Sequence, residues 1–214
     1  MSEAKPTRAG RKPAAGQVRE DLLKAARQLF TEQGFEATTT KQIAARAGAN
    51  AAMIHYYFND KAGLHGAMLQ EAMAPILDGL ERVARDPTGI ALEDIFDLYM
   101  RTLSARPWLP RLVVREVLPE NGRLRKLFQE QVVARAVRAI PVLIRRSQRS
   151  GALRADLDPV LVTLSMASLA VFPFLAADLI RPALGIEYDG EFIDRLIAHT
   201  RELFQHGTAP EEPS

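Results

Sequence analysis

The residues of this chain that could do chemistry gather in one short stretch, residues 38–61, which reads TTTKQIAARAGANAAMIHYYFNDK. A histidine and two tyrosines occupy positions 55–57, and they stand between Ile54 and Phe58. On a helix Ile54 and Phe58 lie one turn apart, so if both face inward the histidine and the first tyrosine must project outward. Imidazole and hydroxyl groups on an exposed helix face can hydrogen-bond phosphate oxygens or the edges of DNA bases.

The same sequence offers little for catalysis. It contains no cysteine, which excludes disulfides, thiolate metal sites and cysteine nucleophiles. Its four histidines show no metal-ligand spacing, and no glycine-rich phosphate loop, nucleophile elbow or pair of catalytic acids stands out. We therefore expect a protein that is not an enzyme and that needs neither a cofactor nor a metal.

Short helices must position the exposed rings. An apolar stripe that starts at residue 18 predicts a first helix, which Gly34 ends. Thr39, with Gln42 three residues later, makes a capping box for a second helix, and Gly48 ends that helix. The second helix is therefore only about two turns long.

A third helix follows directly. Asn50 can cap it, it runs to about Phe58, and Asn59 or Asp60 caps a fourth. Two short helices that are joined by a glycine turn and braced by a longer helix form a helix-turn-helix unit, whose second helix lies in the major groove of DNA. For Tyr57 we leave two roles open, because its ring can pack while its hydroxyl reaches outward.

The remainder of the chain also reads as helical, because no clean alternation of apolar and polar residues marks a strand. Glycine and proline breaks separate the helices, and Asp158 followed by Pro159 makes a firm helix start. Pro75 inside the fourth helix should kink it, either as a hinge or as a static bend. The later helices are expected at 61–84, 90–104, 107–118, 122–149, 158–181 and 189–206. The sequence thus predicts an all-α chain of about nine helices.

The net charge of +2 hides an uneven distribution. Residues 1–61 hold ten lysines and arginines against six acidic residues, whereas residues 62–214 hold eighteen against twenty. A basic N-terminal portion suggests a polyanionic partner, and a merely solvated surface is the alternative. Residues 101–154 hold thirteen basic and three acidic residues, which favours either an anionic ligand or a solvated helix face.

Residues 159–177, PVLVTLSMASLAVFPFLAA, form nineteen residues without a charge, which is long enough for a membrane span. Pro173, the interspersed small polar residues and the Asp178 that follows favour a different reading, a helix buried between subunits. The helices at 158–181 and 189–206 would then form a four-helix dimer interface with their twofold mates. The N-terminus has no apolar run of the kind found in secretion signals, so a cytoplasmic protein is expected.

The stretch GFEATTTKQIAARAGANAAMIHYYFNDKAGL resembles the N-terminal DNA-binding domain of the TetR/AcrR family of bacterial transcriptional repressors. The resemblance covers about residues 18–70, and the rest is similar only in architecture. It implies a homodimer on pseudo-palindromic operator DNA that a small molecule releases. By position, the implied DNA-contacting residues are Thr40, Asn50, Ala51, Ala52, Met53, His55, Tyr56, Tyr57 and Lys61.

The chain departs from the family pattern in the recognition helix. Many members carry a small polar or basic residue and a glycine where this chain has Ala51 and Ala52, and a tyrosine where it has His55. Without Arg, Lys or Gln for bidentate base reading, we expect readout through methyl contacts, phosphates and DNA shape. His55 could meet either a base edge or a phosphate, and we favour phosphate.

The expected domain boundaries are 1–16 for a flexible basic arm, which has no apolar periodicity, 17–61 for the helix-turn-helix domain, 62–206 for a ligand-binding and dimerisation domain and 207–214 for a disordered tail. The arm bears Arg8, Arg11 and Lys12, which either contact DNA or only solubilise the chain. An architectural DNA-binding protein without an effector is the alternative function. Candidate effector-pocket residues, for which ordinary core packing is the competing role, are Tyr99, Leu103, Trp108, Leu112, Glu116, Phe128, Met166 and Phe172.

Overall fold

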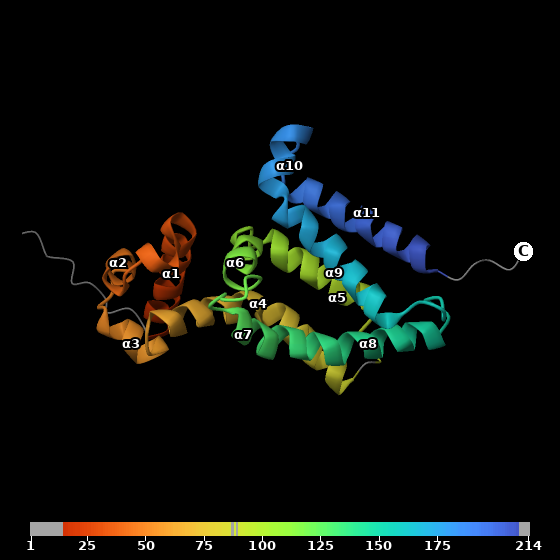
Figure 1. Ribbon diagram of the computed structural model, residues 1–214, viewed down its shortest axis with the longest axis horizontal. Helices are drawn as coiled ribbons and strands as arrows, with labels where there is room; N and C mark the ends of the chain where they lie inside the picture. The colour runs from red at the N-terminus through yellow and green to blue at the C-terminus, as the bar shows by residue number, and fades with distance from the viewer. Residues whose placement is uncertain (1–14, 87, 89, 210–214) are drawn as a thin grey trace, which may run out of the picture. The chain divides into compact units, whose positions relative to one another are not determined.

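The computed structural model describes residues 15–86, 88 and 90–209, and every regular element within these ranges is a helix (Figure 1). The predicted all-α class is confirmed. The proposed basic arm lies outside the described residues apart from Ala15 and Gly16, which belong to the first helix. The proposed tail lies outside them beyond Ala209, and the last helix extends two residues past its expected end, to Thr208.

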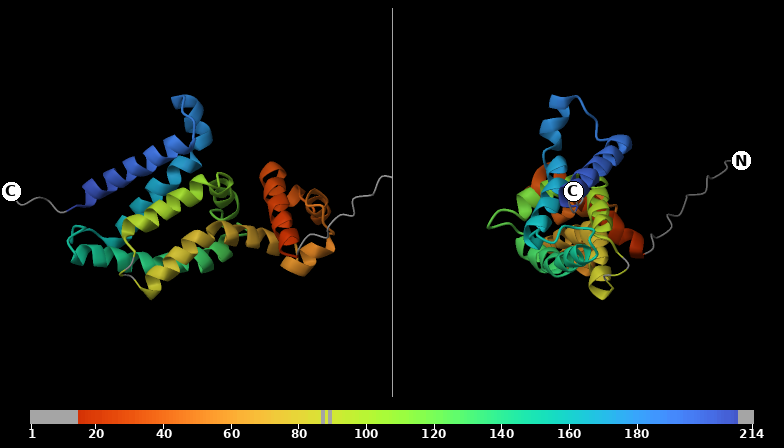
Figure 2. Two further views of the ribbon diagram at one scale, coloured as in Figure 1. Left: turned by 180° about the vertical axis from the view of Figure 1, so that it is seen from behind. Right: turned by 90° about the vertical axis from the view of Figure 1, so that its right-hand side faces the viewer.

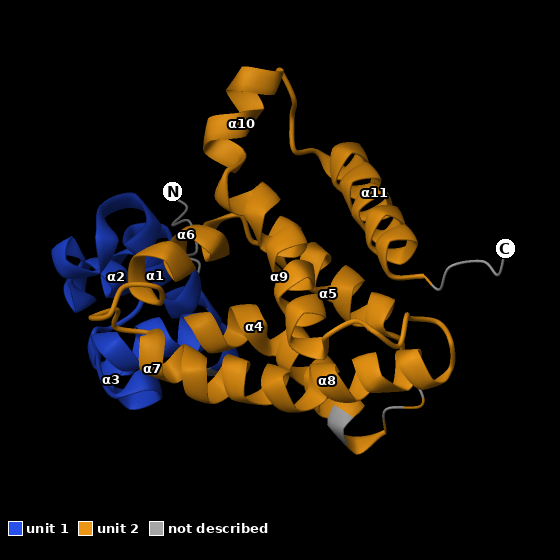
Figure 3. Ribbon diagram, turned by 45° about the vertical axis from the view of Figure 1, so that its right-hand side comes forward, with its two compact units in different colours: residues 1–68 blue, residues 69–214 orange. Residues whose placement is uncertain are grey.

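The chain divides into two compact units, Met1–Met68 and Leu69–Ser214, which we call unit 1 and unit 2 (Figure 3). The division falls inside the fourth helix. Four helices begin in unit 1, namely α1 (Ala15–Ala37), α2 (Thr40–Arg46), α3 (Ala52–Phe58) and α4 (Lys61–Arg85). Pro75 stands inside α4, which continues as one helix on both sides of it.

The boundaries in unit 1 follow from local sequence signals. Gly34 has φ 86° and ψ 170°, a conformation that interrupts α1 where the sequence predicts its end. Gly48 has φ 62° and turns the chain between α2 and α3. The Asp60 carboxylate accepts a hydrogen bond from the Gly63 backbone N–H at 2.7 Å and so caps α4, as one of the two predicted caps.

Unit 2 contains the remaining helices and one π-helical turn, η1. They are α5 (Leu92–Ser104), α6 (Trp108–Glu116), α7 (Arg125–Phe128), η1 (Gln129–Val133), α8 (Ala134–Arg149), α9 (Pro159–Leu175), α10 (Ala177–Leu184) and α11 (Gly190–Thr208). Two predicted helices are therefore subdivided. The helix expected at 122–149 contains the π-helical turn, and the helix expected at 158–181 breaks at Ala176 with a bend of 67°.

Helix α5 runs through the middle of unit 2 and packs against α8, α9 and α11 (Figure 2). A single apolar core joins these helices to the second half of α4 and to α6. In each view α10 extends beyond the other helices of unit 2 (Figures 1 and 2). Among the described residues no single helix has the length and apolar composition to cross a membrane; only the bent pair α9 and α10 reaches that length together.

Candidate DNA-binding surface and effector core

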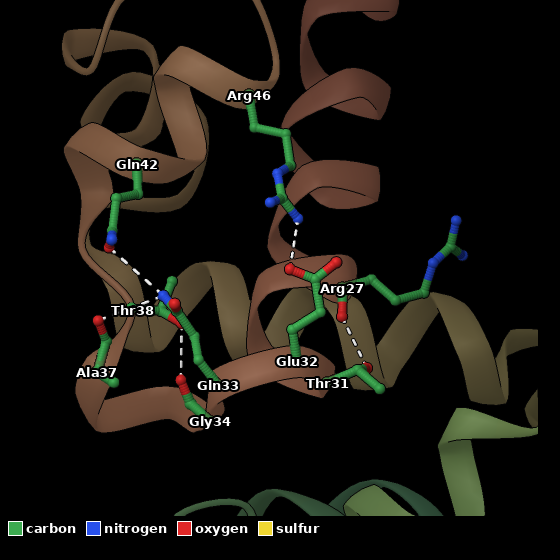
Figure 4. Close-up of polar contacts among 9 residues, drawn as sticks. All are labelled: Arg27, Thr31, Glu32, Gln33, Gly34, Ala37, Thr38, Gln42 and Arg46. Carbon is green, nitrogen blue, oxygen red and sulfur yellow. Dashed lines mark hydrogen bonds and ion pairs between the residues drawn. The ribbon is translucent and has the colours of Figure 1, made fainter.

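The turn from α1 into α2 is fixed by side chains at both of its ends (Figure 4). The Thr38 hydroxyl donates to the Gly34 carbonyl at 2.7 Å, and the Gln33 amide donates to the Thr38 hydroxyl at 3.2 Å. Arg46 at the end of α2 pairs with Glu32 of α1 at 2.8 Å. Helix α2 is therefore held against α1 through both of its ends.

The predicted capping box of α2 is confirmed. The Thr39 hydroxyl accepts a hydrogen bond from the Gln42 backbone N–H at 3.2 Å, and the Gln42 side-chain oxygen accepts one from the Thr39 backbone N–H at 2.8 Å. The cap of α3 is shifted by one residue, because Ala51 occupies the N-cap position. Asn50 still closes the first turn, since its side-chain oxygen accepts from the Ala52 N–H at 2.9 Å.

Helix α3 presents the expected two faces. Ile54 is 1% exposed and Phe58 is 7% exposed, so both belong to the core of unit 1. His55 is exposed, and 75% of Tyr56 is accessible to solvent. Tyr57 is half-buried, with its ring edge-on to Tyr56 at a centroid distance of 4.9 Å, so it supports the exposed ring while keeping one side open.

His55 makes a hydrogen bond that fixes which ring nitrogen faces outward. Its Nδ1 donates to the backbone carbonyl of Asn59, the residue that closes α3 with φ 71°. In a neutral imidazole only one nitrogen carries a proton, so Nε2 is then an acceptor. The exposed side of the neutral ring therefore offers an acceptor.

Lys61 is engaged inside unit 1. Its Nζ donates to the carbonyls of Phe35 and Thr38, both at 2.8 Å, and lies 4.2 Å from the centre of the Phe35 ring. That ring stacks on buried His65 at 4.9 Å. The sequence predicts for Lys61 only a contact with a DNA phosphate, because the two carbonyls that it binds become available only once the turn after α1 has formed.

The DNA-contact candidates all lie in unit 1, on α2, in the turn before α3, on α3 and at the start of α4. They differ in how far they reach solvent. Asn50, Ala52, His55 and Tyr56 are exposed, whereas Thr40, Ala51, Met53, Tyr57 and Lys61 are half-buried. The surface around α3 is thus a mixture of methyl groups, one amide, one imidazole and two phenol rings.

Six of the eight effector-pocket candidates meet in unit 2. They belong to its apolar core or pack against it: Tyr99, Leu103, Trp108, Leu112, Phe128 and Met166. Burial raises the pKa of Tyr99 to about 12, so its hydroxyl stays protonated and remains a hydrogen-bond donor. Glu116 is also buried, and it pairs with Arg123 at 3.4 Å.

Phe172 does not join these residues. Val162, Met166, Ala170 and Phe174 form the buried stripe of α9 at four-residue spacing. A residue two positions from the stripe points to the opposite side of a helix, and Phe172 is accordingly 62% exposed. Other large apolar side chains share this outward face, and those on α9 are Val160, Leu161, Leu164, Leu169 and Leu175.

Comparisons with known proteins agree with this arrangement. Residues 22–68 match the family model of bacterial regulatory proteins of the tetR family, and residues 90–203 match that of a tetracyclin repressor-like C-terminal domain. The HTH-type transcriptional repressor NicS of Pseudomonas putida is 28% identical over 181 residues, which cover 77% of this chain and 84% of NicS.

Two solved structures show the same fold. NalD, the secondary repressor of the MexAB-OprM multidrug efflux pump in Pseudomonas aeruginosa, has a TM-score of 0.65 and 22% identity over 92% of this chain and 98% of its own. A SmeT–triclosan complex has a TM-score of 0.67 and 22% identity over the same shares of the two chains.

Together the two units define a helix-turn-helix regulator with a separate helical C-terminal domain. The chain belongs to the TetR family of bacterial regulatory proteins. It is thereby one of the family's DNA-binding transcriptional regulators, and the architectural alternative without an effector is not favoured.

Proposed function

We propose that this chain represses transcription as a homodimer on a pseudo-palindromic operator and that a small molecule bound in unit 2 releases it. The observation that carries the proposal is the two-faced α3. Its apolar residues Ile54 and Phe58 are buried, and this places His55 and Tyr56 on an open surface. A recognition helix in the major groove needs that arrangement.

Base reading on this surface has an unusual chemistry. Ala51, Ala52 and Met53 offer methyl groups, which fit the methyl group of thymine. Tyr56, Thr40 and Asn50 supply hydroxyl or amide groups for phosphate oxygens. Since α3 contains no Arg, Lys or Gln, we infer that methyl contacts, phosphate contacts and DNA shape carry the sequence preference.

Dimerisation through the last helices rests on the outward face of α9. Leu161 is 62% exposed and Leu164 is 58% exposed, and Leu203 on α11 is 54% exposed. Large apolar side chains that follow one face of two packed helices mark an interaction surface. A twofold mate would bury both copies of the face at once, as an isologous interface requires.

The core of unit 2 supplies an effector site of mixed character. Trp108, Leu112 and Phe128 are only partly buried at the edge of that core, and Tyr99 keeps a protonated hydroxyl there. Glu116 and Arg123 add a charged pair next to α6. These groups suit a largely apolar molecule with few polar groups. No enzyme activity is part of the proposal, and operator binding would place the protein in the cytoplasm.

Capture of DNA fragments from the organism's own genome, followed by footprinting, tests the proposal. We expect a protected site with two half-sites about one helical turn, ~34 Å, apart. Tyr56→Ala should weaken binding to it, while Val137→Ala, an exposed position on α8, should not. Binding of one half-site by a monomer, or no protected site at all, would contradict the proposal.

A further inference from the structure

Helix α10 has an unusual place in unit 2. It is eight residues long, Ala177–Leu184, and none of its residues is buried. Leu179 is 80% exposed and Leu184 is 66% exposed. Isolated helices shorter than about 12–15 residues are marginal in water, and helices in proteins draw most of their stability from burying an apolar face. This helix therefore covers little of its apolar surface within its own unit.

The structure nevertheless holds α10 in a fixed direction. Its axis bends by 67° from that of α9, and the Tyr188 hydroxyl donates to the carbonyl of Pro173 beside the bend at 3.0 Å. Asp178 pairs with Arg111 of α6, and Arg181 pairs with Glu187 beyond the helix. These polar contacts brace both ends of α10 and leave its leucines uncovered.

An uncovered apolar groove lies at the opposite end of α9. Its volume is about 460 Å³. It runs between the first turns of α9 and the last turns of α11, and its apolar lining includes Leu157, Leu161, Leu169, Leu203 and Phe204. Leu161, Leu169 and Leu203 in this groove are exposed. The groove therefore offers an apolar surface on which the exposed leucines of another helix could pack.

Twofold symmetry brings these two features together. Ser165 and Ser168 are small, exposed residues near the middle of α9, where they permit close approach of a second helix. If α9 crosses its mate there in the antiparallel sense, equal distances on either side of the crossing meet each other. Leu157 lies just before the first residue of α9 and Leu179 just after its last, eleven residues from Ser168 in each direction, so an antiparallel pair places them at the same end of the crossed helices.

We propose that α10 is a docking arm whose leucines fill the groove of a second copy of this chain, and that the partner's α10 fills the groove of the first. The inference rests on the proposed dimer through α9 and α11 and adds a reciprocal contact to it. Large exposed apolar side chains recur along α9 from Leu161 through Phe172 and on to Leu179 in α10, so the arm and the groove adjoin that interface.

Thiol cross-linking tests the arm, because the natural chain has no cysteine. Leu161→Cys and Leu179→Cys chains are co-expressed with tags of different size and treated with a short bis-maleimide. We expect a covalent dimer that contains one chain of each kind. Two copies of the same variant should not cross-link to each other. In the proposed dimer Leu161 of one copy lies beside Leu179 of the other, so roughly 20 Å of α9 separates the two copies of Leu161.

Two further variants separate the arm from the dimer. Val137→Cys, exposed on α8, replaces Leu161→Cys as the matched control and should give no mixed product. Leu169→Cys, one residue beyond the proposed crossing, should cross-link to its own copy. If Leu169→Cys cross-links and the mixed pair does not, or if Leu179→Cys joins to itself, the arm is overturned while the dimer stands. If neither the Leu169→Cys chains nor the mixed pair cross-link, the interface of the proposed function fails as well.

Discussion

His55 and Lys61 lie six residues apart and use their polar groups in opposite directions. The imidazole turns one nitrogen back to the Asn59 carbonyl and keeps the other for an outside partner. The Lys61 ammonium donates two of its three N–H groups to backbone carbonyls within unit 1. The first side chain is therefore free to read DNA, whereas the second mainly holds the turn that positions α2.

At Lys61 we expect a loss of stability. Lys61→Ala removes the donors of the Phe35 and Thr38 carbonyls, and leaving such groups unpaired costs about 1–3 kcal/mol. Chemical denaturation followed by circular dichroism measures the change, and Lys41→Ala, at an exposed position on α2, is the matched control. Equal stability of the two variants would contradict the bracing role.

The third N–H of Lys61 leaves room for the proposed phosphate contact. In that case Lys61→Ala also lowers the slope of log affinity against log salt by about one phosphate contact. A normal slope together with reduced stability would assign Lys61 to bracing alone.

At His55 we expect an effect on sequence preference. Because Nε2 of the neutral ring accepts hydrogen bonds, its natural partner is an amino group on adenine or cytosine rather than a phosphate oxygen. His55→Ala should relax preference at one operator position by about 1–3 kcal/mol. Selection from randomised operators measures this preference. Uniform weakening at every sequence would return His55 to the phosphate contact that the sequence favoured.

At the scale of elements, short-range signals were sufficient for most helix boundaries, including those of unit 1, but not for the break between α9 and α10. The capping box at Thr39 and the glycine at 34 act within a few residues, so their consequences could be predicted from sequence. The division of α9 from α10 depends on Tyr188 and Arg111, which reach the bend from other segments. Neither the exposed position of Phe172 nor the inner contacts of Lys61 could be predicted before the fold was known.

The start of α9 permits a local test. The Asp158 carboxylate accepts hydrogen bonds from the N–H groups of Val160 and Leu161 at 2.7 and 3.4 Å, with Pro159 in the first turn. Asp158→Ala should lower the free energy of unfolding by about 0.5–2 kcal/mol, the usual contribution of an N-cap. Asp156→Ala removes only an exposed pair with Arg154 and should cost less. Equal losses in urea denaturation would show that Asp158 does not act as a cap.

At the scale of the whole molecule, the proposed repression depends on two recognition helices that bind one operator together. Linking two binding events raises the apparent affinity by about 10²–10⁴ without any new contact, so loss of the dimer should be visible in DNA binding. The proposed interface on α9 can therefore be tested far from any residue that touches DNA. A large fall in operator affinity after such a change would come from lost linkage rather than from lost contacts.

Leu164→Glu provides this test, with Val137→Glu as its control. Leu164 on α9 is 58% exposed and Val137 on α8 is 64% exposed, so the two substitutions place the same charge on comparably open positions. In the dimer the first charge would be buried without a partner, which is strongly unfavourable, whereas the second would stay in water. We expect Leu164→Glu to give monomers in analytical ultracentrifugation and to reduce affinity for the full operator to that for a single half-site. Val137→Glu should remain dimeric with unchanged affinity, and a dimeric Leu164→Glu protein would exclude this face of α9 from the interface.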